Sequence, residues 1–425
     1  MPEPAMRLPD KDGHLRRQFL HWAARQSACV CLDNCGSEVD RYGQNAFLLG
    51  VATRSNPVSY GSLDELDEAL AQGGHGWLFG FLSYELKGEV EPRLVDGLEA
   101  RVAFPAMRFF RADVVVRISH AEGDIVVEQG YSEALMQEVN AADVGMDFSG
   151  VFPGFQSNFT KEQYCATVER LREHIREGDI YEINLSQCFS AKVGLASPVN
   201  TYERLTARSP MPFSGYCQWE GLHLLCASPE RFLQLHEGQL LTQPIKGTAP
   251  RGATAAEDKE NAEILRNSIK ELAENVMIVD LSRNDLNRSC ETGTVQVPNL
   301  FEVQTFPRVL HLVSTITGRK RLDVSAVQAI RNAFPPGSMT GAPKVRACEL
   351  ISQYEQLARG VYSGSLGYFD PSGNFDLNVV IRSLMYDAHR EILSYHVGGA
   401  ITWDSDPEAE YAETLLKAQA IEGLF

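Results

Sequence analysis

The 425-residue sequence is short of positive charge and of long apolar runs. Lysine and arginine number 39 against 56 aspartate and glutamate residues, giving a formal net charge of −17. A chain with this excess of negative charge repels a phosphate backbone and an anionic membrane surface, so nucleic-acid and membrane binding are disfavoured. No stretch approaches the roughly 18 uninterrupted apolar residues of a membrane helix, and the first residues include no apolar signal segment. These absences favour small-molecule chemistry and a cytoplasmic location.

Zinc-binding and nucleotide-binding patterns are also absent from the sequence. Of the nine cysteines, Cys29, Cys31 and Cys35 form the one cluster, and no second ligand pair stands at zinc spacing. We expect buried thiols in a reducing compartment. The glycine-rich stretch "GSMTGAPK" lacks the spacing of a P-loop, so nucleotide binding is not expected.

Strand-like and helix-like segments are mixed along the chain. The first part has β-branched and aromatic runs such as "AFLLGVAT" and "GWLFGFLSYEL". A stretch rich in Gly, Pro, Ser and Asn near residues 143–158 indicates a boundary, which divides the chain into regions 1–150 and 151–425. After it, Thr160 and Gln163 form a capping box for a helix that Gly178 ends.

A lysine, Lys246, stands in "TQPIKGTAPRG", where proline and glycine constrain the backbone. The preceding segment predicts a hairpin that turns at Glu237-Gly238. A three-residue turn would place Glu230 opposite Lys246 on one face of the sheet, whereas a two-residue turn would place them on opposite faces. An ordinary surface Lys/Glu pair is the competing interpretation.

Two predicted helices carry acidic pairs. Glu271 and Glu274 stand at i and i+3 in a segment whose apolar stripe is Leu265, Ile269, Leu272 and Val276. Near the C-terminus, Asp406 is the expected N-cap and Pro407 the first residue of a helix with Glu410, Glu413 and Lys417 on one stripe. Oxygen ligands of this kind suit magnesium, but two solvated helix faces would give the same pattern. His311, on a predicted strand, would by itself more often be a satisfied sheet histidine than a catalytic one.

Nine collinear motifs from about residue 155 onward resemble the chorismate-utilising enzymes, the anthranilate synthase component I family. They are "EGDIYEINLSQ", "SPERF", "PIKGTAPRG", "ELAENVMIVDLSRND", "HLVSTITG", "PPGSMTGAPKVRA", "SGSLGYF", "IRS" and "VGGAITWDSDPEAEYAETLLKA". The resemblance implies an α+β fold with a large antiparallel sheet sandwich and helices on the outside. It also implies that region 1–150 completes the sandwich and that region 151–425 binds chorismate.

Within this family, Lys246 favours the amine-forming aminodeoxychorismate synthase branch, in which the lysine resembles a nucleophile. Anthranilate synthases typically carry alanine there, and the water-adding branch usually carries a lysine base where this chain has Glu182. The resemblance implies Glu230 as general acid/base, and a reacting Lys246 should have a depressed pKa. Thr248 and His311 match further active-site positions. Anthranilate synthase component I remains the alternative, and a non-catalytic regulatory subunit is the remote one.

The resemblance also implies the ligands of the substrate. Mg²⁺ would be held by Glu271, Glu274, Glu410 and Glu413, with Glu274 and Glu413 in direct contact, and would bind the ring carboxylate. The positions that match the family's grip on the enolpyruvyl carboxylate are Tyr368, Arg382, Lys417 and the backbone amides around Gly398, Gly399 and Ala400. Since no cysteine lies in a glutaminase nucleophile turn, we expect a separate glutamine amidotransferase to supply ammonia. No fused lyase segment is recognised, so the expected product is aminodeoxychorismate, on the route to para-aminobenzoate and folate.

Overall fold

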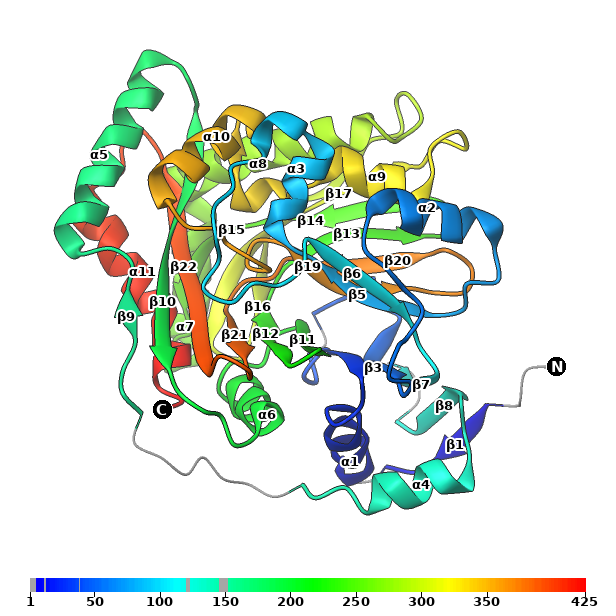
Figure 1. Cartoon of the computed structure of the whole chain (residues 1–425). Helices are drawn as coiled ribbons and strands as arrows, with labels where there is room; N and C mark the ends of the chain where they lie inside the picture. Colours follow the sequence, from blue (N-terminus) through cyan, green and yellow to red (C-terminus); the bar gives the residue numbers. More distant parts are fainter. Residues whose placement is uncertain (1–4, 11–12, 38, 120–122, 145–151) are drawn as a thin grey trace.

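The computed structural model describes residues 5–10, 13–37, 39–119, 123–144 and 152–425. Within these ranges the strands form one sheet of twelve and one of ten, and every strand pairing is antiparallel. Helices cover the outside of the two sheets (Figure 1). The expected α+β sandwich is therefore confirmed.

The twelve-stranded sheet runs from the N-terminal region into the C-terminal one. In spatial order its strands are β1 (Met6–Leu8), β8 (Ile125–Gln129), β7 (Val114–Ser119), β3 (Asn45–Ala52), β2 (Ala28–Asp33), β11 (Phe213–Trp219), β12 (Leu222–Ser228), β21 (Ser383–Asp387), β22 (Ile392–Ile401), β10 (Glu182–Lys192) and β18 (Gly341–Ala342), with β9 (Gln156–Ser157) paired to β10.

The ten-stranded sheet is assembled in the same way. Its order is β15 (Ile245–Pro250), β17 (Val309–Arg319), β14 (Gln239–Gln243), β13 (Arg231–His236), β20 (Phe375–Asn378), β19 (Ser365–Phe369), β5 (Leu78–Leu82), β6 (Met107–Arg111) and β4 (Ser59–Tyr60), with β16 (Gln296–Thr305) paired to β17. The N-terminal segments thus supply strands to both sheets. The predicted boundary between residues 150 and 151 lies outside the described residues.

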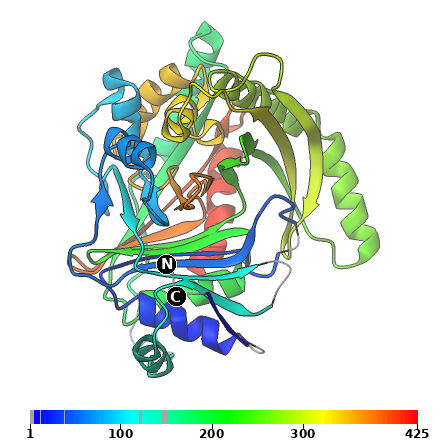
Figure 2. The ribbon, with the colours of Figure 1, turned by 90° about the vertical axis from the view of Figure 1, so that its right-hand side faces the viewer.

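The helices lie on the outer faces of the two sheets (Figures 1 and 2). The face of the twelve-stranded sheet that points away from the other sheet is covered by α1 (His14–Ala23), α4 (Glu133–Asn140), α6 (Pro198–Arg208) and α11 (Pro407–Glu422). The remaining helices are α2 (Leu63–Gln72), α3 (Lys87–Val90), α5 (Lys161–Glu177), α7 (Ala255–Asn267), α8 (Ile269–Asn287), α9 (Ala326–Ala333) and α10 (Lys344–Glu355), with short 3₁₀ turns at Tyr84–Leu86, Pro92–Leu94 and Gly337–Met339.

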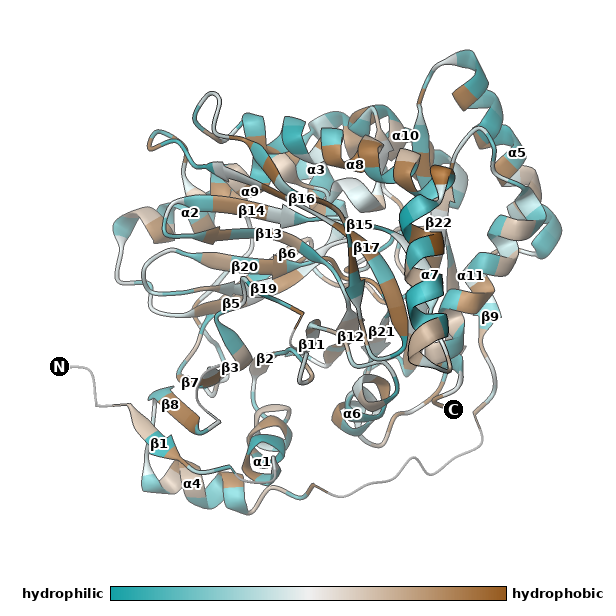
Figure 3. Ribbon diagram, turned by 180° about the vertical axis from the view of Figure 1, so that it is seen from behind, coloured by the Kyte–Doolittle hydropathy of each residue, from teal (hydrophilic) through white to brown (hydrophobic). Residues whose placement is uncertain are grey.

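The largest core lies between the sheets. Val30 and Leu224 of the twelve-stranded sheet and Phe79, Phe109 and Leu233 of the ten-stranded sheet belong to one buried cluster. In Figure 3 the ribbons of α5 and α7 alternate between teal and brown, as expected for helices with one face on the protein and one in water. No helix in the described part of the chain combines the length and the apolar composition needed to cross a membrane.

The helix ends follow the sequence closely. Thr160 and Gln163 make both bonds of the capping box of α5, and Gly178 ends the helix with φ 83°. Asp406 caps α11 by accepting a hydrogen bond from the Ala409 amide. Both predictions are confirmed. Caps can be predicted from the sequence because the capping bonds join residues three apart in the chain.

The predicted stripe of four apolar residues is wrong. The segment is divided into α7 and α8 at Ser268, whose backbone is extended and whose hydroxyl caps α8. Leu265 is buried on α7, but Ile269 is 85% exposed and Val276 is 44% exposed. A helical period cannot be extrapolated across a break, because the helix restarts at a new rotation angle.

Of the two forms considered for the predicted hairpin turn, the structure has the two-residue one. His236 pairs with Gln239, so the turn has two residues, Glu237 and Gly238, with φ 48° and 80°. A bulge between Arg231 and Gln234 then shifts the register, and β15 pairs with β17 rather than with β13. Glu230 and Lys246 are therefore not cross-strand partners, although the fold brings them close by another route.

Candidate active site

Lys246 lies on β15, with its side chain 9% exposed. Its Nζ donates a hydrogen bond to Glu182 Oε1 at 2.6 Å, and Glu182 is the first residue of β10 in the other sheet. Gly247 follows with φ 91°, and a Cβ there would lie 3.0 Å from Glu271 Oε2. The glycine thus lets β15 approach α8 closely and places the lysine at the junction of both sheets.

The protonation of Lys246 differs from the sequence expectation. Burial alone would lower the pKa of Lys246, but the carboxylates of Glu182, Glu274 and Glu230 outweigh burial and raise it above the ordinary value. The expected depression of the Lys246 pKa is therefore wrong. Lys246 holds its proton there, as one half of a buried ion pair.

Glu230 lies between β12 and β13 and is 4% exposed. Burial raises the pKa of Glu230 to about 7, and the nearby Ser338, Lys246 and Arg382 oppose this only partly. A carboxyl group with a pKa close to neutrality can both donate and accept a proton at physiological pH. The structure thus gives Glu230 the property that a general acid/base requires.

Thr248, His311 and Arg382 form a hydrogen-bonded chain. His311 Nε2 lies 3.1 Å from Arg382 Nη2, and its Nδ1 lies 3.0 Å from Thr248 Oγ1. Because arginine has only donors, Nε2 accepts and Nδ1 carries the proton that is donated to Thr248. Burial, with the charge of Arg382, lowers the pKa of His311 well below its usual value. The imidazole is neutral and its tautomer is fixed.

Arg382 retains free donors toward the site. In the part of the chain that the structure describes, the contact with His311 is the one hydrogen bond that its guanidinium makes. Burial lowers the pKa of Arg382 to about 10, and Glu230 acts in the opposite direction. A partly buried guanidinium with unused N–H groups is suited to bind a carboxylate.

The four candidate metal ligands line α8 and α11 in two pairs. Glu274 is 7% exposed and Glu410 is 3% exposed, whereas Glu271 and Glu413 are half-buried. Glu274 Oε1 is buried without a hydrogen-bond partner, and burial raises the pKa of Glu274 to about 7. Burying such a group is costly unless a cation or donor compensates it. This orphaned oxygen and the all-carboxylate donor set fit a hard divalent cation.

The carboxylates do not converge in this structure. Among the described residues, no three of the four offer oxygens that all lie within 4.8 Å of one another; the group that does is His174, Glu177 and Asp179, at the exposed end of α5. Instead, the Lys270 ammonium lies 3.9 Å from Glu274 Oε1 and 3.6 Å from Glu410 Oε1. The Lys270 ammonium therefore lies near two of the four candidate ligands, in a donor set of the kind that a hard divalent cation prefers.

Lys417 completes the α11 side of the group. Its Nζ lies 2.8 Å from Glu413 Oε1 and donates to the Gly398 carbonyl at 2.8 Å. A Cβ on Gly399 would lie 3.3 Å from Glu410 Oε2, so the glycine allows β22 to approach α11 closely. Gly398, Gly399 and Ala400 are central residues of β22, paired with β10.

Tyr368 is the one predicted site residue that lies apart. It belongs to β19 and packs against Trp77 and Phe79, with ring centroids 5.7 and 6.2 Å away. It lines a small cavity of about 60 Å³ with Asp40 and Asp376, not the group around Lys246. The structure therefore does not bring Tyr368 together with Arg382 and Lys417.

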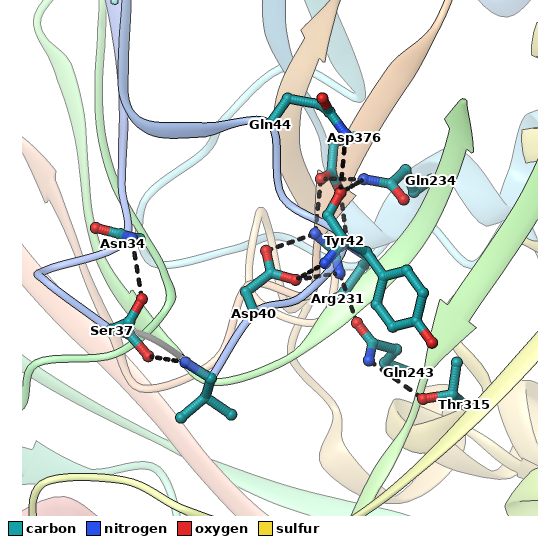
Figure 4. Close-up of polar contacts among 11 residues, drawn as sticks. Asn34, Ser37, Asp40, Tyr42, Gln44, Arg231, Gln234, Gln243, Thr315 and Asp376 are labelled. Atoms are coloured by element: carbon teal, nitrogen blue, oxygen red, sulfur yellow. Dashed lines mark hydrogen bonds and ion pairs between the residues drawn. The ribbon is translucent and has the colours of Figure 1, made fainter. Parts of the chain in front are cut away.

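Sequence reasoning missed three contributors. Glu182 was considered only as a branch marker, yet it is the ion-pair partner of Lys246. Lys270 adjoins Glu271 in the sequence, and its i,i+4 spacing to Glu274 is a signal that could have indicated it. Arg231, next to Glu230, is fully buried and donates all five of its N–H groups to Asp40, Asp376 and Gln243 (Figure 4). It thereby anchors the backbone from which Glu230 projects.

Comparison with known proteins identifies the family. Residues 20–423 match the family described as chorismate binding enzyme. The chain belongs to this family. Chorismate binding enzymes similar to it include aminodeoxychorismate synthase component 1 of Escherichia coli, 38% identical over 360 residues, with 82% of this chain and 76% of the relative covered.

Other relatives are longer than this chain. The chloroplastic aminodeoxychorismate synthase of Arabidopsis thaliana is 38% identical over 413 residues, which cover 91% of this chain. The chain spans about half the length of the plant relatives, 44% of the Arabidopsis thaliana protein and 50% of the probable one from Oryza sativa subsp. japonica.

Solved structures of the chorismate binding enzyme fold superpose over nearly the whole chain. Anthranilate synthase component I from Streptococcus pneumoniae TIGR4 aligns with a TM-score of 0.75 and 27% identity, covering 99% of this chain and 93% of the other. The menaquinone-specific isochorismate synthase of Escherichia coli has a TM-score of 0.76 at 19% identity, covering 99% and 94%, and this likeness concerns the fold alone.

Proposed function

We propose that the chain aminates chorismate at C4 and forms 4-amino-4-deoxychorismate on the route to para-aminobenzoate and folate. The observation that carries the proposal is Lys246, buried at the junction of the sheets beside Glu182 and close to Glu230. The names of the Escherichia coli and Arabidopsis thaliana relatives support the same reaction. An anthranilate-forming enzyme is the alternative, since anthranilate synthase component 1 of Aquifex aeolicus (strain VF5) is 39% identical over 270 residues.

Lys246 and Glu230 divide the chemistry between them. The neutral Lys246 amine attacks C2, the ring π electrons move toward C4, and the C4–O bond breaks. Hydroxide is a poor leaving group, so Glu230 gives its proton to that oxygen and water departs. Ammonia then forms a bond to C4, the π electrons move back, and the C2–N bond to Lys246 breaks. The proton released by the new amine returns to Glu230, and one difficult substitution becomes two easier ones.

The charged residues around this pair hold the substrate. Arg382, with its free N–H groups, and Lys417 bind the enolpyruvyl carboxylate. Glu271, Glu274, Glu410 and Glu413 would hold Mg²⁺, which when bound supplies charge neutralisation and orientation for the ring carboxylate. His311 keeps the Arg382 guanidinium in place from its neutral tautomer.

The ammonia comes from a second protein in this proposal. The Escherichia coli relative is named component 1, which implies a further component of that enzyme. We carry this implication to the present chain and assign the partner as a glutamine amidotransferase. With ammonium salt in its place, the chain is expected to act alone.

The test is product analysis from chorismate, Mg²⁺ and ammonium salt, by mass spectrometry and fluorescence. Aminodeoxychorismate, which retains the enolpyruvyl group, is expected, and Lys246→Ala should abolish it. Fluorescent anthranilate with pyruvate would instead establish the alternative reaction. Unchanged chorismate under all conditions would indicate a non-catalytic subunit, and full activity of Lys246→Ala would remove the lysine from the mechanism.

A further inference from the structure

Lys270 is the third ammonium group near the acidic pairs of α8 and α11, and it is held differently from the other two. Lys246 and Lys417 each have a carboxylate oxygen at hydrogen-bond distance, 2.6 and 2.8 Å away. Lys270 Nζ lies 3.9 Å from Glu274 Oε1 and 3.6 Å from Glu410 Oε1, beyond the usual range of a hydrogen bond. It therefore interacts with these carboxylates through charge alone.

The Lys270 side chain is largely exposed to solvent, whereas the two carboxylates that its ammonium faces are buried. The Lys270 side chain is 52% exposed, whereas the side chains of Glu274 and Glu410 are 9% and 4% exposed. A lysine stem in the first turn of α8 has free rotamers toward solvent, so the ammonium can leave without any movement of the helices. Glu410 stays in place meanwhile, because Ser405 Oγ donates to its Oε1 at 2.8 Å.

We infer that the Lys270 ammonium stands in for the divalent cation between α8 and α11 and has to move aside when the ion binds. The inference rests on the proposed function, because it concerns the same magnesium site. Without the ion, the ammonium lowers the repulsion among the carboxylates of the two helices. When the divalent cation is bound, the displaced Lys270 ammonium remains close to it and weakens the binding of the cation by repulsion. Lys270 thus sets the metal affinity of the site.

The experiment measures Mg²⁺ binding directly, by isothermal titration calorimetry of the full chain freed of metal. We expect Lys270→Ala to lower the Kd for Mg²⁺ about tenfold. The repulsion between the single charge of the lysine and the double charge of Mg²⁺, about 6 Å apart in a water-like medium, corresponds to roughly a tenfold change in Kd. Lys270→Arg keeps the charge and should bind Mg²⁺ like the wild type. Lys161→Ala is the matched control, because Lys161 pairs with Glu408 in the first turn of α11 and contacts none of the four carboxylates.

A second readout is thermal unfolding. Metal-free Lys270→Ala should unfold at a lower temperature than the metal-free wild type and should gain more from added Mg²⁺. An unchanged or higher Kd in Lys270→Ala would overturn the inference and leave the proposed function intact. An absence of Mg²⁺ binding in the wild type and in every variant would instead overturn the metal assignment in the proposed function, and this inference with it.

Discussion

At the scale of single residues, Glu230 and Lys246 hold their protons in the opposite order from the one that the proposed reaction needs. The resting lysine is charged, because the pKa of Lys246 is raised, and Glu230, with a pKa of about 7, is largely ionised above neutrality. The reactive form has the proton on Glu230 and none on Lys246. Its fraction is constant between the two pKa values and falls below the lower and above the higher one.

The first prediction concerns Glu230→Gln. We expect kcat/KM for chorismate to fall about 10²- to 10⁴-fold, because the amide has no proton to give to the leaving hydroxyl. Wild-type kcat/KM, measured at constant free ammonia, should rise up to a pH of about 7 and then level off. The variant should lack this plateau and keep rising toward the pKa of Lys246. Glu237→Gln, in the exposed hairpin turn, is the control, and a plateau retained in Glu230→Gln would contradict the assignment.

The second prediction concerns Glu182→Gln. Burial lowers the pKa of Lys246 and the Glu182 carboxylate raises it. Without the carboxylate the effect of burial is less opposed, so the pKa of Lys246 should fall. The alkaline limb of kcat/KM should therefore move to lower pH in the variant. The same pH profile measures this effect. If the alkaline limb stayed where the wild type has it, the group that titrates there would not be Lys246.

At the scale of secondary-structure elements, local hydrogen bonds were predictable and distant pairings were not. The caps at Thr160 and Asp406 depend on bonds that span three residues, which the sequence displays directly. The register around Lys246 depends on a bulge and on β17, which lies between β14 and β15 although about 60 residues separate it from them in the chain. Spacing along one hairpin contains no information on such an inserted strand.

The third prediction belongs to helix α11. Asp406→Ala removes the side chain that caps the helix bearing Glu410, Glu413 and Lys417. We expect a loss of about 1 kcal/mol in the free energy of unfolding, measured by urea titration. Asp406→Asn is the matched control, because asparagine accepts the same hydrogen bond and should retain nearly all of the stability. An equal loss in both variants would mean that the charge of Asp406, not its cap, matters.

At the scale of the whole molecule, the motifs predicted the members of the site better than their arrangement. The resemblance selected Glu230, Lys246, Arg382 and Lys417, which the fold does bring together. It also selected Tyr368, which the fold places elsewhere, because a motif fixes the strand but not the face on which a side chain emerges. Partners such as Glu182 come from the other sheet, and no local pattern records which sheets meet.

The Arg231 cluster in Figure 4 links the two sheets. Asp40 comes from the loop between β2 and β3 of the twelve-stranded sheet, while Arg231 and Asp376 belong to the ten-stranded sheet. The Arg231 side chain is 0% exposed and that of Asp40 is 6% exposed. A buried ion pair adds little net stability over an apolar pair, but removing one partner leaves a buried charge poorly compensated.

The fourth prediction follows from this asymmetry. Asp40→Ala should cost about 3 kcal/mol in the free energy of unfolding, the lower end for a broken buried pair, because Asp376 still faces Arg231. Arg41→Ala, which removes the adjacent exposed pair with Glu302, is the control and should cost at most about 1 kcal/mol.

Burial opposes ionisation of Asp40, but Arg231 outweighs it and lowers the pKa of Asp40. The stability that Asp40 supplies is therefore present above the pKa of a free carboxyl group and is lost as the pH falls through the lower, folded value. The unfolding free energies of the wild type and Asp40→Ala, measured in urea, should thus differ most near neutrality and converge in acid. A difference that did not depend on pH would mean that Asp40 stabilises the junction by packing rather than by its charge.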